Sequence, residues 1–262
     1  MTTFNPVKMI QNSIKEYKYF TKRPWTLKQV GKFWDTVDDY DDFNKKLYPY
    51  YKRFTNSREL FYKHYKFKTK LRLEILDIQT RSGVGALFWS KIFKKSNFTC
   101  VDFSENLLKK AKIRLKNKKN FSFKKVLNEN FSLKKKYDII FCYETVEHVF
   151  NFQKFIKSLK NHLKKDGYLI ITCPNVSWEI IHWLTAIIEF NHSEGPHRFI
   201  GLNKLQKTFT KLNLKILNYN STILIPFSKK FSISLDKFLT RKLPASIKKL
   251  IMLRHTFILM NK

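Results

Sequence analysis

Two patterns of hydrophobic and polar positions alternate along the chain from residue 71 onward. Short, nearly continuous apolar runs predict strands that are buried on both faces, at residues 73–78, 98–102, 121–127, 137–142 and 168–173. Between them, apolar residues recur at helical spacing, as at Leu107, Leu108, Ala111 and Leu115, with Ser104 as a candidate N-cap. Strands that alternate with helices predict an α/β fold with a doubly wound, mostly parallel sheet.

The same pattern divides the chain into three parts. Residues 1–67 are polar, aromatic and helix-like, with an acidic patch at 35–42, and predict an N-terminal helical cap that packs its aromatic side chains on the core. Residues 68–225 are predicted to form the main domain. Residues 226–262 are predicted to be a basic C-terminal extension that completes the sheet. An apolar helical stretch at 178–188 is either core or a wall for an apolar substrate.

Composition narrows the class of protein. The chain has 262 residues, and its 43% hydrophobic content excludes a disordered chain. Its 52 Lys and Arg against 20 Asp and Glu give a formal net charge of +32. Such a charge is typical of proteins that bind nucleic acid or an anionic membrane. The basic residues are mostly lysine and are scattered, a distribution that compositional bias alone produces. The basic segment 229–249 is either a solvated helical face or a membrane-surface segment.

Cysteine usage and the N-terminal sequence indicate a reducing compartment. Cys100, Cys142 and Cys173 are far apart and form no disulfide or metal-binding pattern, so we expect them to be buried as small apolar residues. Residues 1–20 contain no continuous apolar run of the kind found in secretory signals. We therefore expect a cytoplasmic protein.

Candidate chemistry lies just after the predicted strands. In a doubly wound sheet, ligands bind at the carboxyl ends of the strands, near the point where strand order reverses. Asp77 ends the first strand, Gly83 opens the helix after it, and Asp102 ends the second strand. A carboxylate in the position of Asp102 can accept hydrogen bonds from both hydroxyls of a ribose, and a glycine at a helix start lets backbone approach a ligand closely.

With further segments the sequence resembles the class I S-adenosylmethionine-dependent methyltransferases over about residues 71–219. The segments that carry the resemblance are 75–78, 101–104, 137–148 and 163–175. The Glu-x-x-Glu-His run at 144–148, Pro174-Asn175 and the His-Arg-Phe segment at 197–199 are most similar to the small-molecule branch that includes the ubiquinone-biosynthesis O-methyltransferases. The resemblance implies a Rossmann-like sheet of seven strands and S-adenosylmethionine as cofactor.

The resemblance also implies roles for individual residues. Asp77 and Gly83 match the motif that holds the methionine end of the cofactor, and Asp102 matches the ribose-binding acid. Asn128 falls where the family often binds the adenine amino group. Glu144 would lie near the transferable methyl group.

The sequence differs from the family motif at two positions, and three further residues occupy positions that bind metal in some relatives. Where the family has glycines, this chain has Gln79 and Arg81; Arg81 either pairs with the cofactor carboxylate or blocks the pocket. Glu144, Glu147 and His148 occupy positions that bind a divalent metal in some relatives, although the sequence alone assigns no metal here.

The resemblance implies transfer of a methyl group to a small-molecule acceptor, and we expect a hydroxyl oxygen as the nucleophile. His148 is the first candidate for the general base and His197 the second. Two alternatives stay open. One is an RNA methyltransferase, which the charge favours. The other is a degenerate methyltransferase fold that does not catalyse because of Gln79 and Arg81.

Overall fold

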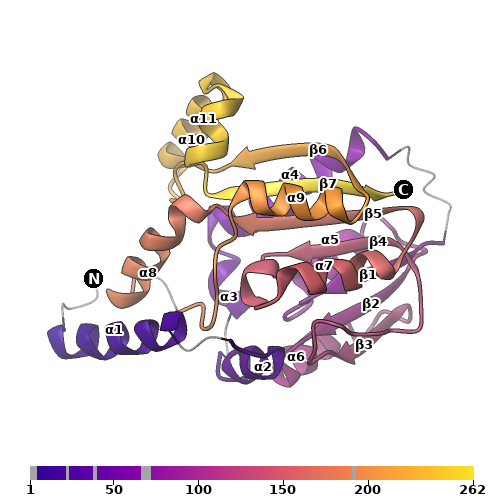
Figure 1. Cartoon of the computed structure of the whole chain (residues 1–262), viewed down its shortest axis with the longest axis horizontal. Coiled ribbons are helices and arrows are strands. Elements are labelled where there is room, and N and C mark those ends of the chain that lie inside the picture. Colours follow the sequence, from indigo (N-terminus) through magenta and orange to yellow (C-terminus); the bar gives the residue numbers. More distant parts are fainter. Residues whose placement is uncertain (1–4, 22–23, 38–39, 66–71, 191–192) are drawn as a thin grey trace.

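A single seven-stranded sheet organises the computed structural model, which describes residues 5–21, 24–37, 40–65, 72–190 and 193–262 (Figure 1). The strand order is β3-β2-β1-β4-β5-β7-β6. The strands are β1 (Glu74–Ile78), β2 (Asn97–Asp102), β3 (Phe121–Lys125), β4 (Tyr137–Tyr143), β5 (Leu163–Pro174), β6 (Leu214–Thr222) and β7 (Arg254–Asn261).

Strand order reverses at β1, which pairs in parallel with β2 on one side and with β4 on the other. Strands β1 to β5 are mutually parallel, and β7 inserts antiparallel between β5 and β6. The carboxyl ends of β1, β2 and β4 therefore meet at one edge of the sheet, and the loops that follow them form the candidate site.

Helices cover both faces and the carboxyl edge of this sheet. In Figure 1, α7 and α9 lie over the near face, whereas α4 and α5 lie behind it. The helices are α1 (Pro6–Thr21), α2 (Leu27–Asp35), α3 (Tyr40–Asn44), α4 (Tyr48–Tyr62), α5 (Val84–Ser90), α6 (Glu105–Leu115), α7 (Phe152–Asn161), α8 (Glu179–Ile187), α9 (Leu202–Lys211), α10 (Lys230–Lys242) and α11 (Ala245–Ile251), with short 3₁₀ turns at Val146–His148 and Val176–Trp178.

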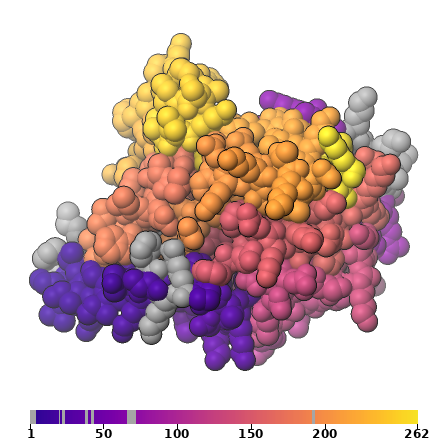
Figure 2. All heavy atoms as spheres, in the orientation of Figure 1, coloured from indigo at the N-terminus to yellow at the C-terminus, as the bar shows by residue number. Residues whose placement is uncertain are grey.

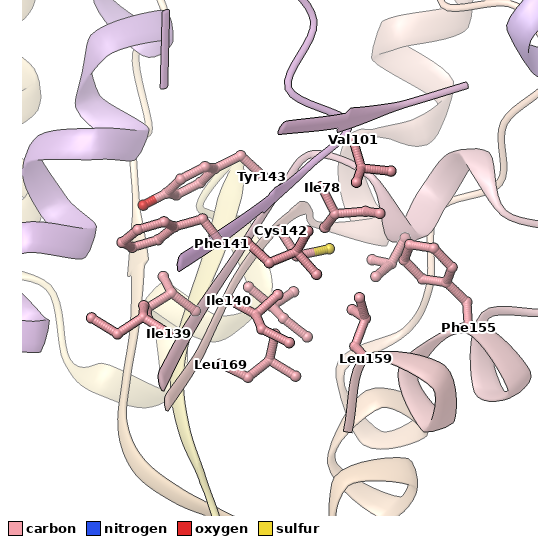
Figure 3. Packing of buried hydrophobic residues seen from close by; sticks show 14 of the residues in the cluster. Ile78, Val101, Ile139, Ile140, Phe141, Cys142, Tyr143, Phe155, Leu159 and Leu169 are labelled. Carbon is pink, nitrogen blue, oxygen red and sulfur yellow. The ribbon is translucent and has the colours of Figure 1, made fainter. Parts of the chain in front are cut away.

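The core lies between the sheet and these helices. Figure 3 shows side chains of β4 and β5, such as Ile140 and Leu169, packed toward Phe155 and Leu159 of α7. Trp34, Phe54 and Phe61 of the N-terminal helices are fully or almost fully buried in the same cluster. The N-terminal helices thus share one continuous core with the sheet, and the predicted packing of their aromatic side chains is confirmed.

The predicted elements match the structure closely around the sheet. All five predicted strands form, although β5 begins at Leu163, earlier than its apolar run. The prediction of burial on both faces is wrong for β3, which ends at Lys125 and is largely exposed because it lies at the edge of the sheet. The Ser104 side chain accepts a hydrogen bond from the Leu107 amide, as an N-cap does. The three cysteines are buried and unpaired.

The interpretation of residues 178–188 as core is wrong. Most apolar side chains of α8 are exposed, and of that helix only Ile187 is buried. The helix stands at the carboxyl edge of the sheet rather than against one of its faces (Figure 1). Residues 226–262 form α10 and α11 and then β7, which lies inside the sheet between β5 and β6.

Candidate functional site

The loop after β1 has a left-handed backbone at three positions. Gln79 and Arg81 both have φ of 53°, and Gly83 has φ of 85° and is the N-cap residue of α5. A Cβ at Gly83 would lie 3.0 Å from the Leu115 side chain of α6, so glycine also allows the loop to pack closely on that helix. Gln79 and Arg81 adopt the backbone conformation that glycine favours, at a conformational cost.

Asp102 holds this loop in place. Its carboxylate accepts hydrogen bonds from the main-chain amide of Arg81 at 2.7 Å and from that of Ser104 at 2.9 Å. The side chain is fully buried, and burial raises its pKa to about 6. Asp77 is similarly buried, with its pKa raised by burial to about 7, and it accepts a hydrogen bond from the Thr80 hydroxyl.

The Arg81 side chain lies across the same edge of the sheet. Its Nη2 donates to the Glu144 carbonyl oxygen at 2.9 Å, and its guanidinium lies 4.5 Å from the centre of the Tyr40 ring. Within the described part of the chain, its Nε and both polar atoms of the Gln79 amide are buried without hydrogen-bond partners. Such atoms are costly in a protein interior and indicate that something polar is to be bound there.

The acidic patch of the N-terminal cap acts on these loops. The Asp41 carboxylate accepts hydrogen bonds from the Ser82 amide and hydroxyl, and also from the Tyr50 hydroxyl. The Asp35 carboxylate accepts from the Ser104 hydroxyl and the Asn106 amide at the start of α6. Residues 38 and 39 of the predicted patch, and the side chain of residue 42, lie outside the described residues. The cap acids thus stabilise the amino-terminal ends of two helices.

A cavity of about 810 Å³ is lined by Tyr40 and Glu144, the two residues that the Arg81 guanidinium contacts. Polar side chains line one part of it, among them Arg53 of α4, Glu144, Glu147, His148 and Arg254 of β7. Apolar and aromatic side chains from α8 and from the segments around it and before α9 and α10 also line the cavity: Trp178, Ile181, Phe190, Phe199, Pro226 and Phe227. The cavity therefore suits a molecule with a polar end and an apolar body.

Two glutamates in this cavity have opposite electrostatic environments. Glu144 forms a two-point ion pair with Arg254, with Nε to Oε1 at 3.0 Å and Nη2 to Oε2 at 3.2 Å. Burial acts to raise the pKa of Glu144, but Arg254 and then Arg53 leave that pKa below its ordinary value. For Glu147, burial and then the Glu144 carboxylate raise the pKa well above its ordinary value.

His148 lies in the same cavity and is almost fully buried. Burial lowers its pKa to about 3, so the imidazole is neutral near pH 7. Its Nε2 lies 3.8 Å from a Glu194 carboxylate oxygen, and its Nδ1 lies 3.4 Å from the Pro196 carbonyl oxygen. His197 stands 6.3 Å from His148 between ring centres and is half-buried, with its Nδ1 2.8 Å from the Gly195 carbonyl oxygen.

The structure does not bring every predicted site residue together. Arg81, Asp102 and Glu144 meet at the switch point through the contacts above, and Gln79 belongs to the same loop after β1. Asn128 is exposed, and its side chain accepts a hydrogen bond from the Asn130 amide in a local turn. Among the described residues, no group of three or more His, Cys, Asp or Glu side chains has a geometry that could hold a metal ion.

Sequence reasoning missed the residues that the outer elements contribute. Tyr40, Tyr50 and Arg53 come from the cap, and Arg254 comes from the last strand. Arg254 did carry a signal, because an arginine at the start of an apolar strand needs a charged partner when it is buried. The motifs after the predicted strands contain no spacing that indicates a role for Tyr40, Tyr50 or Arg53.

Several known proteins that resemble this chain are methyltransferases. A family model described as a methyltransferase domain matches residues 49–219. The ubiquinone biosynthesis O-methyltransferase of Rickettsia prowazekii is 25% identical over 152 residues, which are 55% of this chain and 60% of that protein. The malonyl-[acyl-carrier protein] O-methyltransferase of Bacillus cereus is 33% identical over 100 residues, 38% of this chain and 37% of that protein. The matched parts thus span less than two thirds of these curated relatives.

Solved structures agree on the fold. The plantazolicin methyltransferase BpumL, solved with a pentazolic desmethylPZN analog and SAH, matches with a TM-score of 0.61 at 18% identity and covers 98% of this chain and 100% of its own. Phosphoethanolamine N-methyltransferase 2 of Haemonchus contortus, solved with S-adenosyl-L-methionine, matches with a TM-score of 0.63 at 15% identity, over 88% of this chain and 60% of its own. With a family match over residues 49–219 and a Rossmann-like methyltransferase sheet, this chain belongs to the methyltransferase domain family.

Proposed function

We propose that this protein transfers a methyl group from S-adenosylmethionine to the hydroxyl oxygen of a small molecule. Family membership and the names of the curated relatives support the reaction class. The observation that carries the proposal is the group of polar side chains at the switch point, directly beside a cavity of about 810 Å³.

The residues present fit the amino-acid end of this cofactor. The Gln79 amide offers one buried donor and one buried acceptor, and Arg81 offers a buried Nε donor, all three without partners in the described part of the chain. A zwitterion with an ammonium and a carboxylate group matches this set. The Asp102 carboxylate would accept from the ribose hydroxyls, as the resemblance implies. We still propose that Asn128, whose side chain is exposed, contacts the adenine amino group.

Arg81 and its loop must move for the nucleoside end to reach Asp102. In the structure, Asp102 is fully buried and bonded to two main-chain amides, and the Arg81 side chain covers this edge of the sheet. One hydrogen bond to a carbonyl oxygen and the face of Tyr40 hold the guanidinium, and the carboxylates of Asp41 and Glu194 attract it. These are contacts that the carboxylate of a ligand can replace.

When bound, S-adenosylmethionine supplies an electrophilic methyl group that a nucleophile removes by in-line displacement. The chain contributes orientation and a place for the proton. The apolar wall would hold the body of the acceptor, and the polar part of the cavity would hold its hydroxyl group. Such positioning is worth on the order of 7–11 kcal/mol in favourable cases.

Two neighbours in the cavity are candidates for the proton acceptor. His148 is the candidate that the sequence indicated, but burial holds its pKa at about 3, which makes it a weak base. Glu147 lies beside it with a raised pKa and a carboxylate oxygen that has no partner among the described residues. Because Glu147 lines the cavity next to His148 and one of its carboxylate oxygens has no partner among the described residues, we propose Glu147 as the base, with His148 and, farther out, His197 as positioning residues.

A titration calorimetry experiment with the whole chain tests this proposal. We expect S-adenosylhomocysteine to bind at one site per chain, and Asp102→Asn to weaken that binding by about tenfold or more, since a carboxylate acceptor is lost. The absence of heat at millimolar ligand would leave the second candidate, a methyltransferase fold without catalysis. The closed arrangement around Asp102 is the observation that favours this second candidate.

A further inference from the structure

Large apolar side chains are exposed on the helices that stand at the carboxyl edge of the sheet. Ile180 of α8 is 70% exposed, Phe231 of α10 is 78% exposed, and Leu250 of α11 is 68% exposed. Others on the same three helices and the segments beside them are Ile181, Trp183, Leu184, Ile188, Phe190, Phe227, Phe238, Ile247 and Ile251. In Figure 2, α10 and α11 protrude from the body of the molecule, with α8 below them. We call α8, α10 and α11 with these side chains the edge surface.

Phenylalanines of the edge surface follow one side of α10. Phe227, Phe231 and Phe238 are spaced by four and seven residues, which places them on one face of a helix and its entry. All three are more than half exposed. Aromatic and aliphatic residues on one face, with lysines beside them, are typical of helices that lie in the interface of a membrane.

The charge of the same segment is of one sign. Residues 226–252 contain seven basic side chains, Lys229, Lys230, Lys237, Arg241, Lys242, Lys248 and Lys249, and one acid, Asp236. Asp236 is buried, and its carboxylate accepts from the Leu224 and Ile225 amides and from the Tyr48 hydroxyl. The exposed side of α10 and α11 therefore presents only positive charge.

Charge by itself does not single out this surface, because lysines cover much of the protein. Helix α6 is also basic, but Ile113 is its only exposed large apolar residue, and Glu105 adds a negative charge. The edge surface differs from α6 because dense positive charge and many exposed apolar side chains coincide there. Helix α1, which contacts α8, combines both properties as well, with Val7, Ile10 and Lys15 exposed. An anionic surface with a hydrocarbon interior complements both properties, whereas RNA complements only the charge.

The cavity opens on the edge surface. Phe190, after α8, and Phe227, before α10, lie with their ring centres 6.5 Å apart. Both line the cavity and both are more than half exposed, at 65% and 52%. Lys229 lines the cavity next to Phe227. A molecule that enters between these rings passes directly from the edge surface to the polar residues inside.

We propose that the edge surface binds the face of an anionic lipid bilayer, and that the cavity takes an acceptor with a hydrocarbon body from that bilayer. The binding is peripheral: no helix in the described residues is long and apolar enough to cross a membrane. The proposed membrane contact does not depend on the proposed methyl transfer. The proposed nature of the acceptor does rest on the proposed methyl transfer.

Sedimentation of the full chain with lipid vesicles tests the membrane contact without any catalytic measurement. We expect the protein to sediment with phosphatidylcholine vesicles that contain phosphatidylglycerol, and much less with phosphatidylcholine alone. The double variant Phe231→Ser/Phe238→Ser and the double variant Lys230→Glu/Lys237→Glu should each weaken binding on the order of tenfold. All four side chains are exposed, so we expect both variants to fold.

The matched control lies on α6, where Ile113→Ser/Lys112→Glu changes one exposed apolar and one exposed basic residue. This control should leave vesicle binding unchanged, and S-adenosylhomocysteine binding should be unchanged in all three variants. That second measurement separates a failure of the membrane contact from a failure of the proposed function.

Four results would overturn the proposal. One is the absence of sedimentation with anionic vesicles at low salt. Another is an equal loss in the α6 control, which would indicate unspecific attraction. A loss with the lysine variant but not with the phenylalanine variant, together with retention on single-stranded RNA, would assign the surface to nucleic acid. A dimer in solution that Phe231→Ser/Phe238→Ser dissociates would assign it to a second copy of the chain.

Discussion

At the scale of single residues, Gln79 and Arg81 occupy positions where the resemblance expects glycine. Both keep the positive φ that a glycine would have, and a left-handed backbone costs about 1–2 kcal/mol for a residue with a side chain. Both also place buried polar atoms without partners at the switch point. Because backbone strain and unpaired buried polar atoms both lower stability, we expect residues that combine them at this edge of the sheet to bind the ligand.

Gln79→Gly should therefore separate stability from binding. We expect the free energy of unfolding to rise by about 1 kcal/mol, because backbone strain and a buried unpaired amide are removed. We expect the affinity for S-adenosylhomocysteine to fall by about tenfold, because two hydrogen bonds are lost. Urea unfolding and titration calorimetry measure the two effects.

Asp166→Gly is the control, since Asp166 has φ of 58° and is exposed near the start of β5. It should stabilise the protein without changing affinity. If Gln79→Gly stabilises the protein and binds the ligand as well as the wild type does, the Gln79 side chain does not touch the cofactor.

Asp77 gives stability a pH dependence of unusual sign. Its pKa of about 7 in the folded protein is above the usual value of about 4 for an unfolded chain. Its contribution to stability is therefore full below about pH 4 and is lost as pH rises through 7. Asp77→Asn should remove this loss, so that the variant gains stability relative to wild type at pH 8 but not at pH 4.

Urea unfolding at both pH values measures this difference. Asp166→Asn, which removes an exposed carboxyl group outside the site, serves as control. A difference for Asp77→Asn that does not change with pH would mean that the Asp77 carboxyl titrates normally.

Glu147 and His148 can be separated by turnover. Glu147→Gln should lower kcat on the order of 10²–10⁴-fold with little change in cofactor affinity, as expected when a general base is lost. His148→Asn should lower kcat much less and leave the shape of the pH profile unchanged. The reverse order would return the role of base to His148.

At the scale of elements, the cap helices hold the loops of the site through close packing and through Asp35 and Asp41. Helix α2 approaches the chain after β2 so closely that a Cβ at Gly31 would clash with the Phe103 carbonyl oxygen. Phe103 and Ser104 directly follow Asp102, so this packing also positions the ribose-binding acid proposed above.

Gly31→Ala should therefore destabilise the protein by about 1–3 kcal/mol, because α2 must move away from Phe103. Thermal unfolding measures the change. Gly201→Ala is the control, since no atom lies within 4 Å of its added Cβ. Equal stability for the two variants would show that the contact between α2 and Phe103 can relax freely.

Elements with strong periodicity could be predicted from the sequence, and elements placed by tertiary contacts could not. The apolar runs of β1 to β5 and the cap at Ser104 depend on local patterns and are confirmed. The apolar sequence of helix α8 is compatible both with a core helix and with the wall of a cavity, so it does not distinguish the two. The exposure of α8 follows from where the chain turns after β5, and a local pattern does not encode that turn.

At the scale of the whole molecule, the candidate site is assembled from parts distant in the sequence. The sequence pattern located the motifs after β1, β2 and β4, because each directly follows a predicted strand. Arg53 from the cap and Arg254 from the last strand reach Glu144 and the cavity only through the fold. Sequence spacing could therefore locate the carboxyl edge of the sheet, but not the charges that surround Glu144.

The same assembly explains why the cofactor crevice is closed in the structure. Arg81 from the β1 loop, Tyr40 from the cap and the carbonyl of Glu144 after β4 meet over this edge. We propose that this arrangement opens for a nucleoside whose ribose binds Asp102.

A crystal structure of the full chain grown with S-adenosylhomocysteine tests that claim most directly. Our account predicts the ribose hydroxyls at the Asp102 carboxylate, the amino-acid end at Gln79 and Arg81, and the Arg81 guanidinium displaced from the Tyr40 ring. A crevice that is still filled by Arg81 and Tyr40 at saturating ligand would contradict it.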